Sequence, residues 1–262
     1  MHQAFELIKN SSNIALVSHI NPDADTLGSS LGLFHALSFL DKQITLYNCS
    51  DIPASLSFLP GIELVTREFP QGCDLVISLD CGDVRRLGLK EGNYKILNID
   101  HHTSNQLYGD ENIVDAHAAS AGSVVLKFLR DLDIPIGEKS ALCLYAALAS
   151  DTGFFKYDET DERVFLDAAY LSSCGANPSY VAKQLCQREP LSKVKLMSNI
   201  LQTLQLRAGG KMAFLYMTQE MMQKCGAKSD EADGAVEKAR SIDGVEISFF
   251  AREEANGKLR AS

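Results

Sequence analysis

The fold is decided by residues 14–29, which read IALVSHINPDADTLGS. Residues 14–17 are an apolar run of strand length, a polar loop follows, and Leu27 begins a set of apolar residues at helical spacing. The same alternation recurs along the chain with the apolar runs 44–47, 75–79 and 95–99. This order predicts an α/β fold, with a Rossmann-like parallel sheet covered by helices on both faces. Ligands bind such sheets at the carboxyl ends of the strands, so we expect the chemistry there.

The C-terminal part of the chain has a different pattern. Before it, helices are expected at 121–132, 139–150, 161–173 and 177–186. After Pro190, which ends any helix before it, the expected order is a helix at 192–204, a strand at 212–217, a helix at 230–240 and a strand at 245–250. We therefore expect a first domain at 1–187, a linker at 188–197 and a smaller α+β domain at 198–262.

The composition is that of a globular protein, with 45% hydrophobic and 23% charged residues in a chain of 262. The longest apolar run, 141–149, is far short of the roughly 20 residues that cross a bilayer, and the N-terminus does not read as a signal peptide. Seven cysteines without a Cys-x-x-Cys pair argue against a disulfide framework or a thiolate zinc site. The sequence therefore predicts a cytoplasmic protein without membrane contact.

The charge of the chain limits its possible nucleic-acid partners. The net charge is −9, there is no tryptophan, and no stripe of Lys and Arg is interleaved with aromatic residues. A long duplex is therefore excluded as a partner, whereas a short oligonucleotide or a nucleotide phosphate fits better. The sequence leaves open whether the protein is a monomer or a homodimer.

Four polar clusters each follow an apolar segment, and they contain the residues with chemical potential. Their members are, in chain order, His19, Asp23, Asp25, Asp80, Asp100, His101, His102 and Asp151. Taken singly, each has an ordinary explanation: Asp25 is well placed to cap a helix, His19 to be a loop histidine, and Asp80 to lie in a turn rich in Asp and Gly. A paired histidine after an apolar strand is less easily explained by packing, since buried imidazoles need partners.

Together these clusters are expected on one rim of one sheet. Carboxylates that converge without a counter-ion repel and shift each other's pKa values, whereas two divalent cations would neutralise them. The candidate ligands are His19, Asp23, Asp25, Asp80, His101 and Asp151. A set dominated by oxygen, with imidazole and no cysteine, suits manganese, magnesium, iron or zinc, and it favours manganese over zinc.

The motifs His19-x3-Asp23-x-Asp25, Asp80, Asp100-His101-His102 and Asp151-Thr152-Gly153 resemble those of the DHH phosphoesterase family. Within the family, the chain is most similar to the bacterial oligoribonucleases that also remove the 3′ phosphate from 3′-phosphoadenosine 5′-phosphate. The resemblance implies a two-manganese centre, with magnesium as the alternative. One cation would take His19, Asp23 and Asp80, and the other would take Asp25, Asp80, His101 and Asp151, with Asp80 bridging.

The resemblance also implies roles around the two ions. His102 would face the substrate phosphate, and Asp100 would orient a ligand imidazole. Asn105 and Arg86 are further candidates for substrate contact on the same rim. The family's second domain contributes an Arg/Ser strand followed by a glycine-rich loop, and the stretch Leu259-Arg260-Ala261-Ser262 resembles that strand, whereas no such loop follows. We therefore expect Arg260 to contact a nucleotide phosphate in a substrate domain that is cut short.

The function implied is that of a manganese-dependent phosphoesterase. It would hydrolyse short oligoribonucleotides from the 3′ end, or 3′-phosphoadenosine 5′-phosphate, with a water activated by two metals. Hydrolysis of a linear or cyclic dinucleotide is an alternative, and pyrophosphate fits less well because the matching Lys and Arg residues are not identified. Another alternative is a nucleotide-binding protein without turnover, because the glycine-rich loop is missing. The plainest alternative is a metal-free α/β domain whose polar residues are caps and turns.

Overall fold

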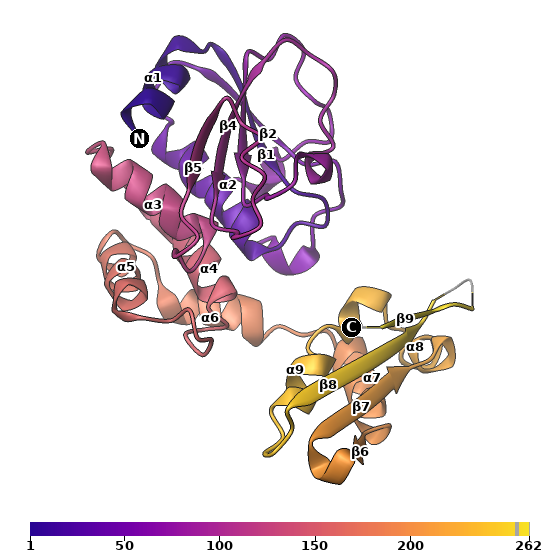
Figure 1. Ribbon diagram of the computed structural model, residues 1–262. Helices are drawn as coiled ribbons and strands as arrows, with labels where there is room; N and C mark the ends of the chain where they lie inside the picture. Colours follow the sequence, from indigo (N-terminus) through magenta and orange to yellow (C-terminus); the bar gives the residue numbers. More distant parts are fainter. Residues whose placement is uncertain (255–256, 262) are drawn as a thin grey trace. The chain divides into compact units, whose positions relative to one another are not determined.

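The computed structural model describes residues 1–254 and 257–261, and the chain divides into two compact units (Figure 1). The first unit is Met1–Gln187 and the second is Arg188–Ser262. Each unit has its own hydrophobic core.

The first unit contains five parallel strands in the order β2-β1-β3-β4-β5. In chain order they are β1 (Asn13–Ser18), β2 (Gln43–Tyr47), β3 (Leu75–Leu79), β4 (Lys95–Asp100) and β5 (Glu111–Val114). The chain continues from β1 to β2 on one side, and from β3 to β4 on the opposite side. The direction in which strands are added therefore reverses between β1 and β3. In open α/β sheets, such a reversal creates a crevice outside the carboxyl ends of the strands. The polar clusters that follow β1 and β3 lie at this reversal.

Six α-helices belong to the first unit, and their buried apolar side chains form one cluster with residues from one face of the sheet. They are α1 (His2–Asn10), α2 (Ala24–Ala36), α3 (Ala121–Asp131), α4 (Glu138–Asp151), α5 (Glu162–Ser173) and α6 (Pro178–Cys186). Alternate strand residues such as Leu16 and Ile77 pack against this layer. The intervening residues, such as Val17 and Val76, face a second cluster made with loop residues that include Phe69, Tyr94 and Tyr108.

The parallel α/β class predicted from the sequence is confirmed, but one detail differs. Helices were expected on both faces, whereas the second face of the sheet is covered by loops and by the short 3-10 helix η3 (Val84–Leu87). The cause is that the connections from β2 to β3 and from β3 to β4 contain 3-10 turns and irregular segments where a crossover helix would normally lie.

Helices α2 and α4 pack very closely, because glycines line the contact. A Cβ atom added at Gly28 would lie 2.6 Å from the Cys143 carbonyl oxygen and 3.0 Å from the Ala147 Cβ. At Gly32 it would lie 2.6 Å from the side chain of Leu144. This close approach places the beginning of α2, which carries Asp25, near the end of α4, which carries Asp151.

The second unit is the predicted smaller α+β unit, and its sheet has the order β6-β7-β8-β9. Strands β7 and β8 are parallel, and the two outer strands pair antiparallel to them. Its elements are α7 (Leu191–Gln202), β6 (Gln205–Arg207), β7 (Met212–Met217), α8 (Gln219–Cys225), α9 (Ala235–Arg240), β8 (Ile247–Glu253) and β9 (Leu259–Ala261). Its core contains Leu196, Ile200, Leu215 and Phe250.

Two segments of the second unit differ from expectation. The range 188–197, expected as a linker, overlaps the helix expected at 192–204, and the structure has α7 there from Leu191, directly after Pro190 at the N-cap position. The helix expected at 230–240 is divided into the 3-10 helix η5 (Ser229–Ala232) and α9, because Gly234 between them has a φ of 98°. Among the described residues, no helix combines the length and apolar character needed to cross a membrane.

Candidate metal centre

The carboxyl edge of the first sheet brings the predicted ligand residues together. The loops after β1, β3 and β4 and the last residue of α4 contribute three groups whose potential ligand atoms lie within 4.8 Å of one another. The groups are His19 with Asp23 and Asp80, Asp25 with His101 and Asp151, and Asp80 with His101 and His102. All six candidate ligands predicted from the sequence therefore belong to one cluster, with Asp80 and His101 each shared by two groups.

The beginning of α2 places Asp23 and Asp25 on the cluster by different means. Asp23 is the N-cap, and its Oδ1 accepts hydrogen bonds from the backbone N–H groups of Asp25 and Thr26, both at 3.0 Å. Its Oδ2 lies 3.7 Å from His19 Nε2. The capping role considered for Asp25 therefore belongs to Asp23.

Asp25 lies in the first turn of α2 and is buried, with 1% of its surface exposed. Its carboxylate accepts hydrogen bonds from the backbone N–H groups of Ala121 at 2.7 Å and Gly122 at 3.0 Å, at the beginning of α3. The Ser29 hydroxyl donates to it at 3.1 Å. The N-terminus of a helix favours a negative charge, so α3 helps to hold this buried carboxylate in place.

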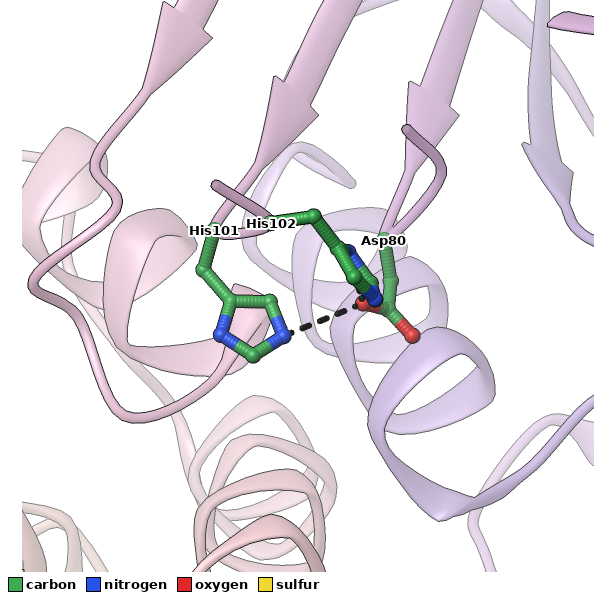
Figure 2. Close-up of side chains that lie close together, drawn as sticks. All are labelled: Asp80, His101 and His102. Atoms are coloured by element: carbon green, nitrogen blue, oxygen red, sulfur yellow. Dashed lines mark ion pairs between the residues drawn. The ribbon is translucent and has the colours of Figure 1, made fainter. Parts of the chain in front are cut away.

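Asp80 is the centre of the cluster. It follows β3 with a φ of 57°, a left-handed conformation that is uncommon for a residue with a Cβ and is often found at functional sites. Its two carboxylate oxygens lie 3.4 Å from His19 Nε2 and 3.4 Å from His101 Nε2, respectively. Figure 2 shows the His101 ring directed at this carboxylate, with His102 beside it. Asp80 Oδ1 is buried and has no hydrogen-bond partner in the part of the chain that the structure describes.

The two imidazoles of His19 and His101 are oriented by backbone carbonyls. His19 Nδ1 lies 2.8 Å from the Ile20 carbonyl oxygen, and His101 Nδ1 lies 3.2 Å from that of Ala118. A nitrogen that donates to a carbonyl carries a proton, so the Nε2 atom of each ring faces the carboxylates and becomes a ligand atom once it gives up its own proton. The resulting separations of 3.4–3.7 Å are too long for direct hydrogen bonds and are compatible with a shared cation.

The pKa values of the clustered groups are strongly shifted when no cation is bound. Burial would lower the pKa of His19, but Asp23 and Asp80 outweigh it and raise that pKa to about 10. Burial would likewise lower the pKa of His101, but Asp80, Asp25 and Asp151 raise it to about 10. Burial, together with the charge of Asp80, raises the pKa of Asp151 to about 6. Without an ion, the cluster therefore retains protons that a cation would displace.

The donor set fits divalent cations. Four carboxylates, from Asp23, Asp25, Asp80 and Asp151, carry four negative charges, which two divalent ions would balance. The Asp80 carboxylate lies between the two imidazoles, with one oxygen 3.4 Å from His19 Nε2 and the other, which has no hydrogen-bond partner among the described residues, 3.4 Å from His101 Nε2. Oxygen ligands with two imidazoles match manganese and magnesium better than a thiolate-preferring metal.

Asp100 contacts a different imidazole from the one expected. Its Oδ1 lies 2.7 Å from His102 Nδ1, whereas the candidate ligand His101 is oriented by Ala118. Asp100 is the last residue of β4, and the centroids of the His101 and His102 rings that follow it lie 4.8 Å apart, with Nδ1 of His102 toward the Asp100 carboxylate. The Asp100 carboxylate is fully buried, and the hydrogen bonds from His102 and Asn105 outweigh that burial and lower its pKa.

The three residues predicted to contact substrate besides His102 lie in different environments. Arg86, at the surface in η3, has its Nη2 3.2 Å from His19 Nδ1, so it lies at the edge of the cluster. The Asn105 amide is hydrogen-bonded to Asp100 and to Asn98. Arg260 is exposed on β9 in the second unit, and Ser262 lies outside the described residues.

The sequence interpretation missed several residues that support the cluster. Backbone groups of Ala118, Ala121 and Gly122 carry no sequence signal. Asn98 did carry one, because an amide inside an apolar strand requires hydrogen-bond partners when it is buried.

Comparisons with known proteins agree with this geometry. A family model described as the DHH family, N-terminal domain, matches residues 13–148. The bifunctional oligoribonuclease and PAP phosphatase NrnA of Thermus thermophilus is 31% identical over 93% of this chain and 74% of its own length. The protein of the same name from Bacillus subtilis is 29% identical over 97% of this chain and 83% of its own length.

Solved structures show the same fold. An exopolyphosphatase-related protein from Bacteroides fragilis superimposes with a TM-score of 0.93, at 23% identity, over 99% of this chain and 81% of that one. A putative family II inorganic pyrophosphatase from Methanococcus jannaschii gives a TM-score of 0.58 at 18% identity, over 95% of this chain and 87% of that one. Given the family match, the relatives and the cluster of acidic and histidine side chains, the chain belongs to the DHH family of phosphoester hydrolases.

Proposed function

We propose that the chain hydrolyses short oligoribonucleotides from the 3′ end and removes the 3′ phosphate of 3′-phosphoadenosine 5′-phosphate, with two divalent cations, manganese above magnesium. The observation that carries the proposal is the buried Asp80 carboxylate, which lies between the His19 and His101 imidazoles and has an oxygen without a hydrogen-bond partner among the described residues. The names of the relatives from Thermus thermophilus and Bacillus subtilis support the substrate class.

The ligand groups support an assignment for each cation. His19, Asp23 and Asp80 would hold one cation, and Asp25, His101 and Asp151 the other. Asp80 would also serve the second cation, because its Oδ1 lies 3.4 Å from His101 Nε2. Bound there, the pair of cations would lower the pKa of a water molecule and balance charge on the leaving oxygen. The backbone carbonyls of Ile20 and Ala118 keep the Nε2 atoms of the two imidazoles free for this role.

The substrate phosphate would meet His102 and Arg86. Nδ1 of His102 donates to Asp100, which raises the pKa of this ring, so the Nε2–H of a half-exposed imidazolium is left to donate to a phosphate oxygen. Arg86, exposed beside His19, offers a guanidinium whose planar fork suits phosphate oxygens. Arg260 on the second unit is our candidate for a more distant phosphate of the nucleotide. We also place the enzyme in the cytoplasm, on the cysteine pattern of its sequence.

The proposal is tested by substrate and metal together. The purified chain is incubated with a 5′-labelled RNA dinucleotide, 3′-phosphoadenosine 5′-phosphate, a cyclic dinucleotide or pyrophosphate, in manganese, in magnesium and with a chelator. Manganese-dependent turnover of the first two, lost with the chelator and in Asp80→Ala, is the expected result. Turnover of only the cyclic dinucleotide or only pyrophosphate would show that the substrate class differs from the one proposed. Binding of nucleotide and metal without any turnover would favour a nucleotide-binding protein.

A further inference from the structure

A network of hydrogen-bonded, buried polar side chains lies on the loop-covered face of the first sheet. Asn98, in the middle of β4, and Ser78, its partner on β3, are both completely buried. The Asn98 amide donates to the Ser78 hydroxyl at 3.0 Å and to the Tyr108 phenol oxygen at 2.9 Å. The Tyr108 hydroxyl in turn donates to the Cys81 carbonyl at 2.8 Å. Because Cys81 follows Asp80, this hydrogen bond attaches the network to the loop that carries the Asp80 carboxylate.

Asn105 links these groups to Asp100, and its amide can lie in only one orientation. Its Oδ1 accepts the backbone N–H of Leu107 at 2.7 Å, so Nδ2 must face the other way. There it donates to Asn98 Oδ1 at 2.7 Å and to Asp100 Oδ2 at 2.5 Å. Both N–H groups of the amide are thus used inside the protein.

The last link is between Asp100 and His102. The Asp100 carboxylate accepts from Asn105 on Oδ2 and faces His102 Nδ1 with Oδ1 at 2.7 Å. A carboxylate in this position accepts only, so Nδ1 of His102 must carry a proton. The order of groups therefore runs from the loop after β3, through Tyr108, Asn98, Asn105 and Asp100, to His102 after β4.

We propose that Tyr108, Asn98 and Asn105 are positioning residues for the reaction, which hold His102 through Asp100 in one orientation with its Nε2 edge available to the substrate. The proposal rests on the proposed function, because it assigns His102 to the substrate phosphate. It assigns Asn105 a positioning role in place of the substrate contact expected from the sequence. It also couples His102 to the Asp80 loop, so both would keep a common geometry when substrate binds.

The first experiment does not depend on turnover. In the magnesium-loaded full chain with ¹⁵N-labelled histidine, NMR should show a hydrogen-bonded proton on His102 Nδ1, assigned by its loss in His102→Gln. The same signal should weaken or disappear in Asn105→Ala. A His102 that carries its proton only on Nε2 would overturn the proposal. An intact Nδ1 signal in a chain that hydrolyses none of the substrates would instead overturn only the proposed function.

The second experiment measures kinetics. Removal of a residue that orients a functional imidazole typically costs roughly 10–100-fold, so Asn105→Ala should lower kcat by this factor, with KM and manganese affinity little changed. Tyr108→Phe should lower kcat less, since it removes one hydroxyl and keeps the ring.

The matched control is Tyr94→Phe. Tyr94 belongs to the same apolar cluster as Tyr108, but its hydroxyl donates to the Lys90 carbonyl, away from these groups. This variant should keep the kcat of the unmodified chain. Equal losses in Tyr94→Phe and Tyr108→Phe, or an unchanged kcat in Asn105→Ala, would reduce the network to a packing role and refute the proposal.

Discussion

The two faces of the first sheet hold the same site by different means. On the helix-covered face, the close packing of α2 against α4 at Gly28 brings Asp25 and Asp151 together beside His101. On the loop-covered face, directional hydrogen bonds from Asn105 and Asp100 orient His102. Close packing is disrupted when a substitution adds volume, whereas a hydrogen-bonded network is disrupted when a substitution removes a donor. The two faces should therefore fail under different substitutions.

Asp80, where both faces meet, should give the largest effect. Asp80→Ala removes the carboxylate that lies between His19 and His101, so we expect turnover to be lost and the affinity for both cations to fall. Activity assays and calorimetric titration with manganese would measure this. Asp83→Ala is the matched control, because Asp83 pairs with Arg85 and is not part of the ligand groups. Similar losses in both variants would contradict a bridging role for Asp80.

Metal affinity should depend steeply on pH. In the metal-free site, the pKa values of His19 and His101 are raised to about 10, so both rings are protonated at pH 8. Each cation needs one of these Nε2 lone pairs, so loading both cations should release about two protons, and the affinity for each cation should weaken about 10-fold for each pH unit below 10. Calorimetry in buffers of different ionisation enthalpy counts these protons. His102→Gln should leave the count unchanged, and binding without proton release would show that the rings are already neutral.

Gly28→Ala tests the packed face alone. Its Cβ would meet the Cys143 carbonyl at 2.6 Å, and because a backbone atom cannot move aside cheaply, α4 must shift. We expect a loss of about 1–3 kcal/mol in the free energy of unfolding, together with weaker metal binding at the Asp25 and Asp151 group. Denaturant unfolding and metal titration measure the two. Gly137→Ala, at a position with open space around it, should change metal binding little. Normal metal binding in Gly28→Ala would show that the packing of α2 against α4 does not determine the geometry of the site.

Thr26→Val should have the smallest effect. The Thr26 hydroxyl donates to the Leu79 carbonyl at 3.0 Å and thus attaches α2 to the end of β3. Its loss should cost about 1 kcal/mol of stability, with turnover nearly retained, because the neighbouring packing remains. Thr26→Ser, which keeps the hydroxyl, is the control in thermal unfolding. A large loss of turnover in Thr26→Val alone would mean that this face also depends on a hydrogen bond.

Much of the fold could be predicted because its signals are local. Strands β1 to β4 each contain a short apolar stretch, and Asp161 and Asn177, where helices were expected to begin, cap α5 and α6. Strand β5 was missed because its four residues are only half-buried and have no apolar pattern. The second face was misjudged because no local signal says which side of a sheet a loop will cover.

The candidate site was less predictable beyond its acidic and histidine residues. Their convergence follows from a general rule for parallel sheets, so it could be argued from residue order. Which carboxylate caps α2, and which imidazole Asp100 contacts, depends on the direction of single side chains. The roles of Asn98 and Tyr108 depend on contacts between β3, β4 and a later loop, which only the three-dimensional structure displays.

The distribution of the candidate ligands has a mechanical consequence. They come from the segments after β1, β3 and β4 and from the end of α4, so a bound ion would tie together parts of the chain that are far apart in sequence. The ion would act as a removable cross-link. At a free concentration 100 times its dissociation constant, it would add about 2.7 kcal/mol to the stability of the folded first unit. A chelator would then lower the melting temperature of this unit, and the second unit would unfold as before.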